Sequence, residues 1–567
     1  MGDKVHMRGV GASNGVAIGP AFVVSRTDVT VPDVADPLAA FRRAAIEVKG
    51  DLDTLGQTAT QAGKPAAAAI LGAQALIAED PMLDDAVAQA LDAGAGLQQA
   101  IEAAGGELSA MLAAMPDEYL AARSADVLEV ADRILRRLAG VDAGALDALT
   151  KASIVVAPAL TAAETANLDP DLVLGFVTEE GGATSHVAVI ARSLGMPAVV
   201  GIGELHEAIP PGATIGIDGG SGEVVVDPDA ETLAELDRRR KQLEQSRTAA
   251  ARFKGQRVVF GGRPMSVAAN VGGPDDVTRA HDAAADGVGL YRTEFLFLDR
   301  SEPPSEEEQV ARYTEALEAF ADPVVVRTFD IGGDKPAPYL TVPDEANPFL
   351  GVRGVRIYGM SGEIIRTQLR ALLRASVNGD LWIMVPMIAT IRDILEVKTL
   401  LDDLRRNLEG AGIAVGNPKL GVMIEVPSAA LIAAGLAPHV DFFSIGTNDL
   451  TQYTMAADRM NGRLIQYSDA AHPAVLRLCH LAAQAARVAS ISVSVCGEAA
   501  ADPILAVLFA AMGIDKLSVA PPSVDLVKSY LATVDADGAG RLLTTALGAH
   551  DAETVRAVVG EALGSPT

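Results

Sequence analysis

The feature that most constrains the fold is an alternation of short apolar segments with amphipathic helical segments, which begins near residue 255 and continues to residue 567. Eight of these apolar segments have the length and composition of buried strands. They are Ser266–Asn270, Gly289–Arg292, Val324–Thr328, Ile383–Met387, Gly421–Glu425, Phe442–Ile445, Val493–Cys496 and Leu517–Val519. Strands separated by helices in this number predict a (β/α)8 barrel, and a doubly wound open sheet is the alternative fold.

The residues before this region predict a smaller α/β domain that is interrupted by helices. Apolar segments typical of strands flank a long stretch, about 37–140, in which apolar residues recur at helical spacing. A chain of 567 residues is also too long for one hydrophobic core. We therefore predict a multidomain α/β protein with a small α/β domain at 1–35 and 143–228, an all-helical insert at 36–142, a linker helix at 229–254 and the barrel at 255–567.

The composition narrows the possible partners and the cellular compartment. The formal net charge of −28 argues against a nucleic-acid or anionic-membrane partner and suits a small basic protein. Two cysteines, Cys479 and Cys496, make no disulfide framework, which fits a reducing cytosol. The N-terminal residues lack the apolar segment of a signal peptide, and no apolar run is long enough to span a bilayer. We therefore expect a cytoplasmic protein.

A glycine-rich segment that ends in a histidine indicates phosphoryl transfer. It reads Gly181-Gly182-Ala183-Thr184-Ser185-His186 and continues into an apolar run. Glycines allow a tight turn that brings backbone N–H groups near an anion, and the two hydroxyls are short hydrogen-bond donors. An imidazole in this setting can accept a phosphoryl group, so His186 is a candidate phosphohistidine. A packing histidine at the start of a helix is the alternative interpretation.

Charged and nucleophilic residues lie where the predicted barrel strands end. In a barrel of this type, the carboxyl ends of the strands carry the catalytic residues. For each arginine taken singly, a structural ion pair on the rim is the alternative role. The candidates are, in chain order, Arg292, Arg327, Glu425, Asn448, Asp449, Arg459 and Cys496.

This set of side chains predicts a small anionic substrate that is bound together with a metal ion. Three arginines require negative charge, and their guanidinium groups match phosphate and carboxylate. Glu425 and Asp449 would repel each other unless a hard cation lay between them, and Mg²⁺ binds one or two carboxylates with water and ligand oxygens. We therefore expect a substrate with both phosphate and carboxylate. The Cys496 thiol could give or take a proton there, whereas Cys479 has the pattern of a buried helix residue.

Together these motifs resemble those of one family, enzyme I of the bacterial phosphoenolpyruvate:sugar phosphotransferase system. The segment that ends in His186 is similar to the family's phosphohistidine motif. Residues 441–453, Asp-Phe-Phe-Ser-Ile-Gly-Thr-Asn-Asp-Leu-Thr-Gln-Tyr, are similar to its barrel signature, which is the more specific of the two. Residues 286–295, 347–351 and 386–388 also match. The likeness covers nearly the whole chain in the same domain order.

The resemblance implies a role for each matching residue. His186 would accept the phosphoryl group of phosphoenolpyruvate, and Cys496 would protonate the departing enolate to give pyruvate. Glu425 and Asp449 would bind Mg²⁺. Thr165 lies in a segment similar to one of the family near the histidine, and would hydrogen-bond the imidazole. The substrate would be held by Arg292, Arg327, Asn448, Asp449, Arg459 and, at the rim, Arg353.

The resemblance also implies partners and a physiological role. The phosphoryl group would pass from His186 to a histidine of HPr, a small phosphocarrier protein docked on the helical insert. This relay would drive the uptake and phosphorylation of sugars. The family further implies a homodimer formed through the barrel domain.

Three features depart from the family pattern. Ala159, Ala162 and Ala163 stand where Asp, Pro and Ser are usual. Val187 follows the histidine where a small or hydroxyl residue is usual, and Gln74 stands in the helical insert where we expect a histidine. The first two do not touch the transfer chemistry, whereas Gln74 bears on the affinity for the carrier protein.

Two other functions compete with this interpretation. A dikinase that uses ATP shares the histidine domain and the barrel, but it needs a nucleotide-binding domain of roughly two hundred residues or more. The insert here is shorter, and the chain has no Gly-x-x-x-x-Gly-Lys loop. A non-catalytic regulator with the same fold is the second alternative, and the intact reactive residues argue against it. A relative from the nitrogen branch would carry an N-terminal sensory domain, for which the helical insert begins too early.

Overall fold

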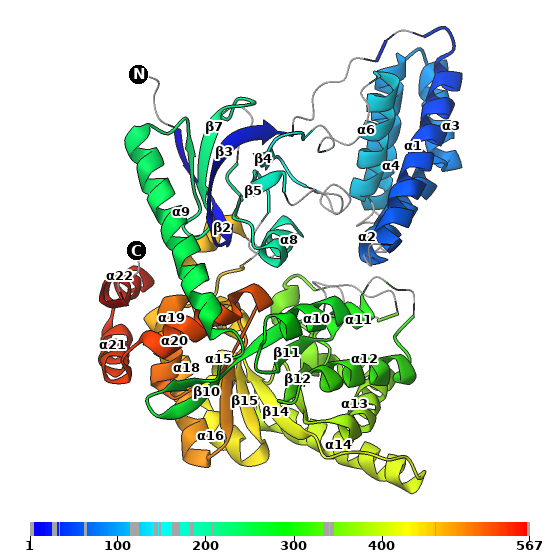
Figure 1. The fold of residues 1–567 in the computed structure, drawn as a ribbon. Coiled ribbons are helices and arrows are strands. Elements are labelled where there is room, and N and C mark those ends of the chain that lie inside the picture. The colour runs from blue at the N-terminus through cyan, green and yellow to red at the C-terminus, as the bar shows by residue number, and fades with distance from the viewer. Residues whose placement is uncertain are drawn as a thin grey trace. The chain divides into compact units, whose positions relative to one another are not determined.

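A computed structural model describes residues 5–24, 31–32, 34–61, 65–113, 124–140, 146, 149–160, 171–181, 186–203, 205, 208–298, 300, 302–332, 339–340, 345–459 and 461–563. The chain forms two compact units, Met1–Lys241 and Gln242–Thr567, and Figure 1 labels many of their elements. The predicted multidomain α/β fold is confirmed, while the bounds of its four predicted domains remain predictions.

An eight-stranded mixed sheet forms the α/β part of the first unit, in the order β1-β8-β7-β3-β4-β5-β6-β2. Strands β3 to β6 are parallel neighbours, and the other pairs are antiparallel. Helix α8 (His186–Leu194) packs Val187, Ala188 and Ala191 into the apolar core on one face of this sheet. The strands are β1 (Val5–Arg8), β2 (Val10–Ser13), β3 (Val16–Val23), β4 (Ser153–Ala157), β5 (Val173–Thr178), β6 (Ala198–Val200), β7 (Thr214–Asp218) and β8 (Glu223–Val226).

The all-helical insert is also present in the first unit. Each of its described helices buries apolar residues in one shared core, as amphipathic helices do in a bundle. Successive helices contribute one or more residues each to this core, among them Phe41, Leu71, Val87, Ile101 and Val127. The helices are α1 (Pro37–Gln61), α2 (Pro65–Ala78), α3 (Pro81–Asp92), α4 (Leu97–Ala113) and α6 (Ser124–Leu138).

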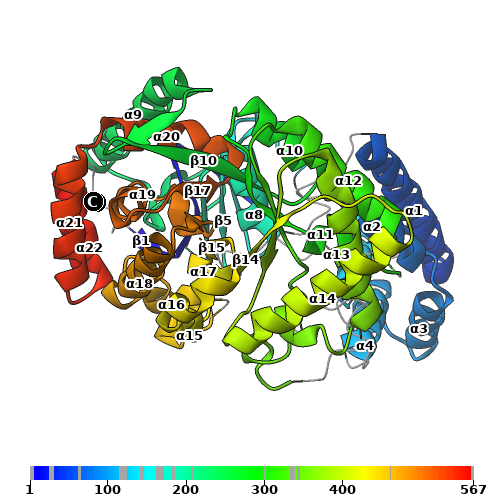
Figure 2. The ribbon, with the colours of Figure 1, turned by 90° about the horizontal axis from the view of Figure 1, so that it is seen from below.

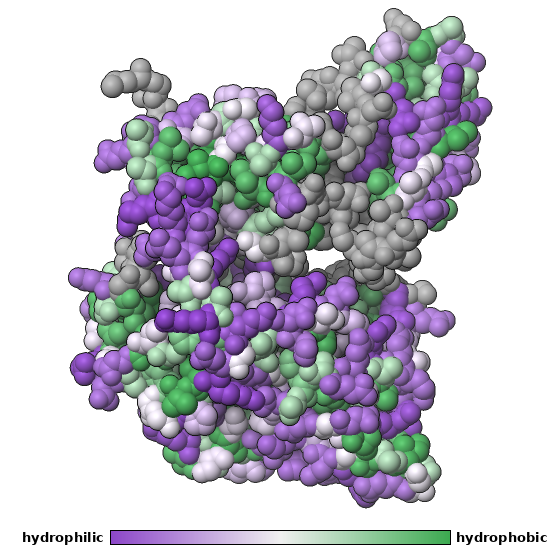
Figure 3. All heavy atoms as spheres, viewed as in Figure 1, coloured by the Kyte–Doolittle hydropathy of each residue, from purple (hydrophilic) through white to green (hydrophobic). Residues whose placement is uncertain are grey.

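The predicted linker helix is α9 (Ala230–Ala250), which continues into a short 3-10 turn. Its sequence is rich in arginine, glutamate and leucine, and Arg238 and Arg239 both contact Glu235 within one turn of helix. Such pairs on an exposed helix contribute a few tenths of a kcal/mol each. Within the described residues, no helix combines the length and the apolar character needed to cross a membrane. Hydrophilic residues cover much of the face in Figure 3, with smaller apolar patches between them.

The second unit is a closed barrel of eight parallel strands. The strands follow one another in chain order from β10 to β17, and pairing of β10 with β11 closes the cylinder, so the alternative of an open sheet was wrong. All eight predicted strands are present, as β10 (Arg263–Val271), β11 (Val288–Arg292), β12 (Val324–Arg327), β13 (Leu381–Val385), β14 (Lys419–Ile424), β15 (Phe442–Ile445), β16 (Ser492–Val495) and β17 (Lys516–Val519). A ninth strand, β9 (Val258–Phe260), was not predicted and pairs antiparallel with β10.

Helices surround the barrel strands, as the view in Figure 2 shows. Apolar residues of these helices and of the outward faces of the strands form the largest core of the protein. The helices are α10 (Pro274–Asp282), α11 (Glu294–Phe297), α12 (Glu306–Ala319), α13 (Gly362–Ala375), α14 (Ile391–Gly410), α15 (Pro427–Leu431), α16 (Ala433–Leu436), α17 (Thr447–Met455), α18 (Pro473–Ala489), α19 (Pro503–Met512), α20 (Val524–Thr533), α21 (Ala536–Gly548) and α22 (Ala552–Leu563).

One buried lysine in the barrel has no hydrogen-bond partner among the described residues. Lys516 is 7% exposed, and its Nζ lies 4.9 Å from the ring centre of Trp382, over which Lys419 also lies. Burial lowers the pKa of Lys516 to about 8, although Asp322 and Asp380 act against this and Lys419 adds to it. The ammonium is therefore dehydrated without full compensation, which opposes folding.

We expect Lys516→Met to stabilise the barrel at neutral pH, by about 1–3 kcal/mol. The pKa of Lys516 is lower in the folded protein than in the unfolded chain. The free-energy cost of burying its charged ammonium is therefore complete below pH 8 and disappears as the pH rises toward about 10.4, the pKa in the unfolded chain. The gain should therefore shrink between pH 8 and pH 10. Urea unfolding followed by tryptophan fluorescence measures it, because Trp382 is the single tryptophan of the chain. Lys528, which is also buried but is bound to Asp286 at 2.9 Å, gives the control: Lys528→Met should destabilise the barrel. A destabilised Lys516→Met variant at pH 7 would refute the expectation.

Candidate active site

The barrel brings the sequence-predicted residues of the second unit to one end. Arg292 and Arg327 are the last residues of β11 and β12, and Glu425 directly follows β14. Asn448 and Asp449 lie in the first turn of α17, after β15. Cys496 directly follows β16, and Arg353 and Arg459 come from the loop after β12 and the segment after α17. Since the strands are parallel, these ends share one face of the barrel, where catalytic residues of such barrels lie.

Arg327 is held by two buried carboxylates that the sequence analysis did not single out. Its Nη2 donates to Glu294 Oε1 at 2.8 Å, and its Nη1 lies 3.4 Å from Asp330 Oδ2. Burial alone would lower the pKa of the guanidinium, but Glu294 and Asp330 together raise it. Apart from the family resemblance of residues 286–295, which include Glu294, the sequence signal for these carboxylates is their position, two residues after Arg292 and three after Arg327.

A chain of alternating charges continues from Asp330 across the site. Arg353 donates to both oxygens of Asp330, from Nε at 3.2 Å and from Nη2 at 2.7 Å. Its Nη1 lies 3.6 Å from Asp449 Oδ1, and Nη1 of Arg459 lies 3.4 Å from the same oxygen. The Phe349 ring lies 5.9 Å from each of these two guanidinium carbons. Three of the four predicted arginines are therefore already paired with carboxylates.

Arg292 is the exception among the four arginines. The described part of the chain gives its side chain no hydrogen bond and no ion pair. Burial, followed by the positive charge of Arg327, lowers the pKa of its guanidinium. A cation in this position gains most from an incoming anion, because the anion would supply the missing partner.

The two predicted metal ligands lie in a setting that suits a hard cation. Glu425 is fully buried; its Oε1 accepts a hydrogen bond from the backbone N–H of Met387 at 2.6 Å, and its Oε2 accepts none from described residues. Asp449 Oδ1 likewise accepts no hydrogen bond from them. Burial, then the charges of Asp449 and Asp330, raise the pKa of Glu425 to about 8. Glu425 Oε2 has no donor among the described residues, and Asp449 Oδ1 has only the two guanidinium groups at 3.4 and 3.6 Å, so both oxygens fit Mg²⁺, whose ligands are oxygens. The described residues contain no group of three or more His, Cys, Asp or Glu for a metal, so substrate and water would complete the coordination.

Cys496 is a protonated thiol at neutral pH. It is 1% exposed, and its Sγ donates to the backbone oxygen of Ile445 at 3.6 Å. Burial raises the pKa of the thiol to about 11, although a hydrogen bond from Ser444 and the charges of Arg327 and Arg292 act in the opposite direction. A thiol that keeps its proton is suited to act as an acid. Beside it, Asn448 Oδ1 accepts from the backbone N–H of Glu498 at 3.0 Å.

The first-unit candidates are described only in part. His186 is the first residue of α8, but its side chain lies outside the described part, as do Gly182–Ser185, Thr165, Ala162 and Ala163. Val187 is buried in the core beneath α8, which accounts for an apolar residue at that position. Gln74 is fully buried and donates to Asp126 Oδ1 at 3.1 Å and Glu129 Oε2 at 2.9 Å, so it joins α2 to α6.

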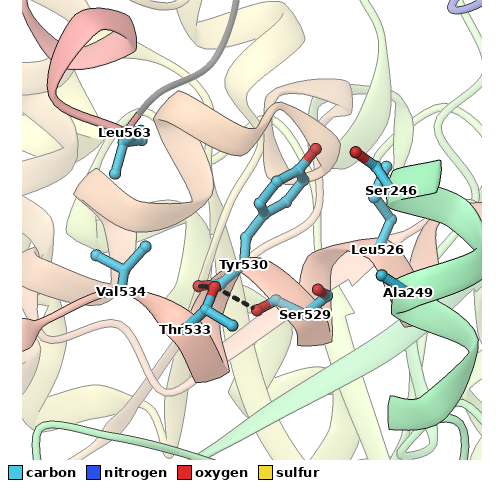
Figure 4. Close-up of a pocket in the computed structure, with 8 residues that line it drawn as sticks. All are labelled: Ser246, Ala249, Leu526, Ser529, Tyr530, Thr533, Val534 and Leu563. Atoms are coloured by element: carbon cyan, nitrogen blue, oxygen red, sulfur yellow. Dashed lines mark hydrogen bonds between the residues drawn. The ribbon is translucent and has the colours of Figure 1, made fainter. Parts of the chain in front are cut away.

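A separate cavity of about 220 Å³ lies between α9 and α20 and does not fit the predicted substrate. Its lining is apolar and hydroxyl-bearing, and Figure 4 shows side chains of the two helices facing each other across it. No charged side chain lines it, so a phosphate would lose its hydration without compensation there. The lining residues are Ser246, Ala249, Leu526, Ser529, Tyr530, Thr533, Val534 and Leu563.

Comparison with known proteins identifies similar sequences along the whole chain. Models of three domains of PEP-utilising enzymes match it: the N-terminal domain at residues 8–123, the mobile domain at 149–222 and the PEP-binding domain at 246–536. Phosphoenolpyruvate-protein phosphotransferase of Bacillus sp. (strain S) is 39% identical over 98% of both chains. The protein of the same name from Streptomyces coelicolor is 41% identical over 98% of both. That of Haloferax volcanii is 42% identical over 84% of both.

Proposed function

Because the chain belongs to the phosphoenolpyruvate-protein phosphotransferase family, we propose that it transfers the phosphoryl group of phosphoenolpyruvate to its own His186 and then to HPr. The observation that carries the proposal is the state of the barrel arginines. Arg327, Arg353 and Arg459 are paired with carboxylates, while Arg292 has no acceptor among the described residues. A site with one unpaired cation among paired ones is incomplete without a small polyanion.

Binding uses the charges of the barrel face. Arg292 binds the phosphoryl oxygens of the substrate. Arg327, Arg459 and the amide of Asn448 bind its remaining negatively charged oxygens. Arg353, which is buried in the structure and not at the expected rim, orients Asp449 through their contact at 3.6 Å. Glu425 and Asp449 would hold Mg²⁺, which supplies positive charge that neutralises the transferring phosphoryl group.

The chemical step makes a nitrogen–phosphorus bond. A neutral imidazole of His186 attacks phosphorus in line, and the bond from phosphorus to the enol oxygen breaks with its electron pair on that oxygen. Cys496 then gives its proton to the methylene carbon of the enolate, which becomes pyruvate. Because His186 and the barrel residues belong to different units, the reaction requires that His186 reach the substrate held by the barrel residues.

The phosphohistidine then serves as the donor in a second transfer. The helical insert docks HPr, whose histidine takes the phosphoryl group and passes it on for sugar uptake and phosphorylation. The acidic charge of −28 suits a basic partner. We propose that the protein works in the cytoplasm as a homodimer formed through the barrel.

Labelling with phosphoenolpyruvate tests the proposal directly. The purified chain is incubated with Mg²⁺ and phosphoryl-labelled phosphoenolpyruvate, and pyruvate is measured. We expect label that is labile in acid and stable in base, with pyruvate released in step. Label from ATP but not from phosphoenolpyruvate would identify a dikinase, and label from neither would leave a binding or regulatory protein.

Replacement of Cys496 by alanine is expected to slow turnover without preventing phosphorylation of His186. A positioned general acid contributes about 10²-fold or more, so pyruvate release should fall by about that factor. Rapid-quench measurement of labelled protein and of pyruvate separates the two events. Cys479→Ala is the matched control, because Cys479 is equally buried but lies in α18. An unchanged rate of pyruvate release in Cys496→Ala would exclude the thiol as the acid.

A further inference from the structure

Met387 has a backbone conformation that is unusual for its residue type. It lies two residues after β13, is 1% exposed and has a φ angle of 60°, in the left-handed region that residues other than glycine rarely adopt. Ala456 and Ser490 also have positive φ angles, but each ends a helix, where this conformation is common. Met387 ends no helix, and the next one, α14, begins only at Ile391. A strained residue at the strand ends of a candidate site therefore indicates a functional constraint.

The N–H group of Met387 is directed at a candidate metal ligand. It donates to Oε1 of Glu425 at 2.6 Å, whereas Oε2 of the same carboxylate accepts no hydrogen bond from the described residues. The two oxygens of Glu425 are therefore not equivalent. A backbone donor to an ionised oxygen forms a short, strong hydrogen bond, and it cannot rotate away as a side chain can. The carboxylate is fixed through Oε1, and Oε2 is the oxygen that a cation can take.

Glycines on two other segments leave the room that this arrangement needs. At Gly354, whose own φ angle is 55°, a Cβ atom would lie 2.8 Å from Cγ and 2.9 Å from Cβ of Met387. At Gly446, which precedes α17, a Cβ atom would lie 3.0 Å from Oε2 of Glu425. The Met387 side chain is also contacted by Tyr453, whose hydroxyl oxygen lies 3.9 Å from its Sδ. Close packing on these sides leaves neither Met387 nor Glu425 free to turn.

We propose that the left-handed backbone of Met387 is a positioning element for the metal ion, because its N–H group holds Glu425 so that only Oε2 reaches the cation. The inference rests on the proposed function, in which Glu425 and Asp449 would hold Mg²⁺. This ion requires near-ideal octahedral geometry and keeps several positions for water and substrate oxygens. A carboxylate that offers one fixed oxygen meets both requirements, whereas one that turned to offer both would take a position from the substrate.

Replacing the amide of Met387 by an ester tests the inference, because it removes the N–H group and keeps the side chain. The α-hydroxy analogue of methionine is introduced by nonsense suppression, in His186→Ala chains so that no phosphoryl transfer occurs. Mn²⁺ is the probe, titrated by electron paramagnetic resonance with and without phosphoenolpyruvate. We expect the Kd for Mn²⁺ to rise about 10- to 100-fold, the usual cost of losing a group that orients a metal ligand.

An ester at Ala389 is the matched control for this experiment. The N–H group of Ala389 donates to Asp393 Oδ2 at 2.9 Å, so this ester also removes a hydrogen bond to a carboxylate from the same loop but leaves Glu425 untouched. Its Kd for Mn²⁺ should equal that of the parent chain. An unchanged Kd in the Met387 ester would overturn the inference. So would an equal loss in both esters, because it would report disruption of the loop.

The Glu425→Gln variant gives a second test that needs no unnatural residue. Where Met387 holds the amide by its carbonyl oxygen, the NH₂ group faces the cation, so Glu425→Gln should bind Mn²⁺ no more tightly than Glu425→Ala. A side chain free to turn would offer its carbonyl oxygen instead, and tighter binding by Glu425→Gln would therefore contradict the inference. Failure of phosphoenolpyruvate to label wild-type His186 would refute the proposed function, and the titrations without phosphoenolpyruvate would still decide the role of Met387.

Discussion

His186→Ala is expected to take up no phosphoryl group from phosphoenolpyruvate, with labelling reduced by more than about 10⁴-fold. The reason is that the imidazole nitrogen supplies the only bond to phosphorus in the proposed intermediate, and alanine has no atom that replaces it. The backbone supports this position, since His186 begins α8. The first N–H groups of a helix have no partner within the helix and favour an anion there. Acid-labile label on the purified variant is the measurement.

The variant should keep an intact barrel, which separates loss of chemistry from loss of folding. Calorimetric binding of phosphoenolpyruvate with Mg²⁺ should match the wild type, because the barrel residues are unchanged. His480→Ala, which alters a partly buried histidine in α18, should label normally. Base-stable, acid-labile label at wild-type level on His186→Ala would mean that another histidine is the acceptor.

The fold could be predicted where local patterning and tertiary structure agree. Each predicted barrel strand overlaps an observed one, because a strand buried on both faces has a continuous apolar run that periodicity detects. Strand β9 is three residues long, too short for such a run. Its signal was the dipeptide Gly261-Gly262, whose positive φ angles of 56° and 79° form the two-residue hairpin turn into β10.

The sequence predicted which residues form the candidate site, but it did not predict which arginines and carboxylates pair with each other. Chain order and parallel strands place Arg292, Arg327 and Cys496 at one face, so spacing was sufficient for them. No spacing rule indicates that Asp330 receives two arginines, because Arg353 comes from a long loop after β12. Pairing depends on loop geometry, which side-chain periodicity does not encode.

The ion pairs of each arginine decide which arginine variant can change substrate binding without also changing the stability of the barrel. Removing Arg327 would leave Glu294 buried without a cation and Asp330 with Arg353 alone, which costs several kcal/mol and complicates the interpretation of any kinetic result. Arg292 has no such partner among the described residues, and burial opposes its charge. Its loss should leave no buried carboxylate unpaired.

We therefore expect Arg292→Ala to lower kcat/KM for phosphoenolpyruvate by about 10²- to 10³-fold while leaving the barrel as stable as in the wild type, or more stable. Arg292→Lys should recover only part of the loss, because an ammonium lacks the two-pronged geometry that matches a phosphate. Steady-state kinetics gives the first quantity, and urea unfolding followed by Trp382 fluorescence gives the second.

Arg392→Ala is the control, since Arg392 is an exposed arginine that pairs only with its helix neighbour Glu396 among described residues. If Arg292→Ala kept its catalytic efficiency, the unpaired guanidinium would not be the phosphate ligand; if it unfolded at lower urea, Arg292 would have a structural partner that the described residues do not include.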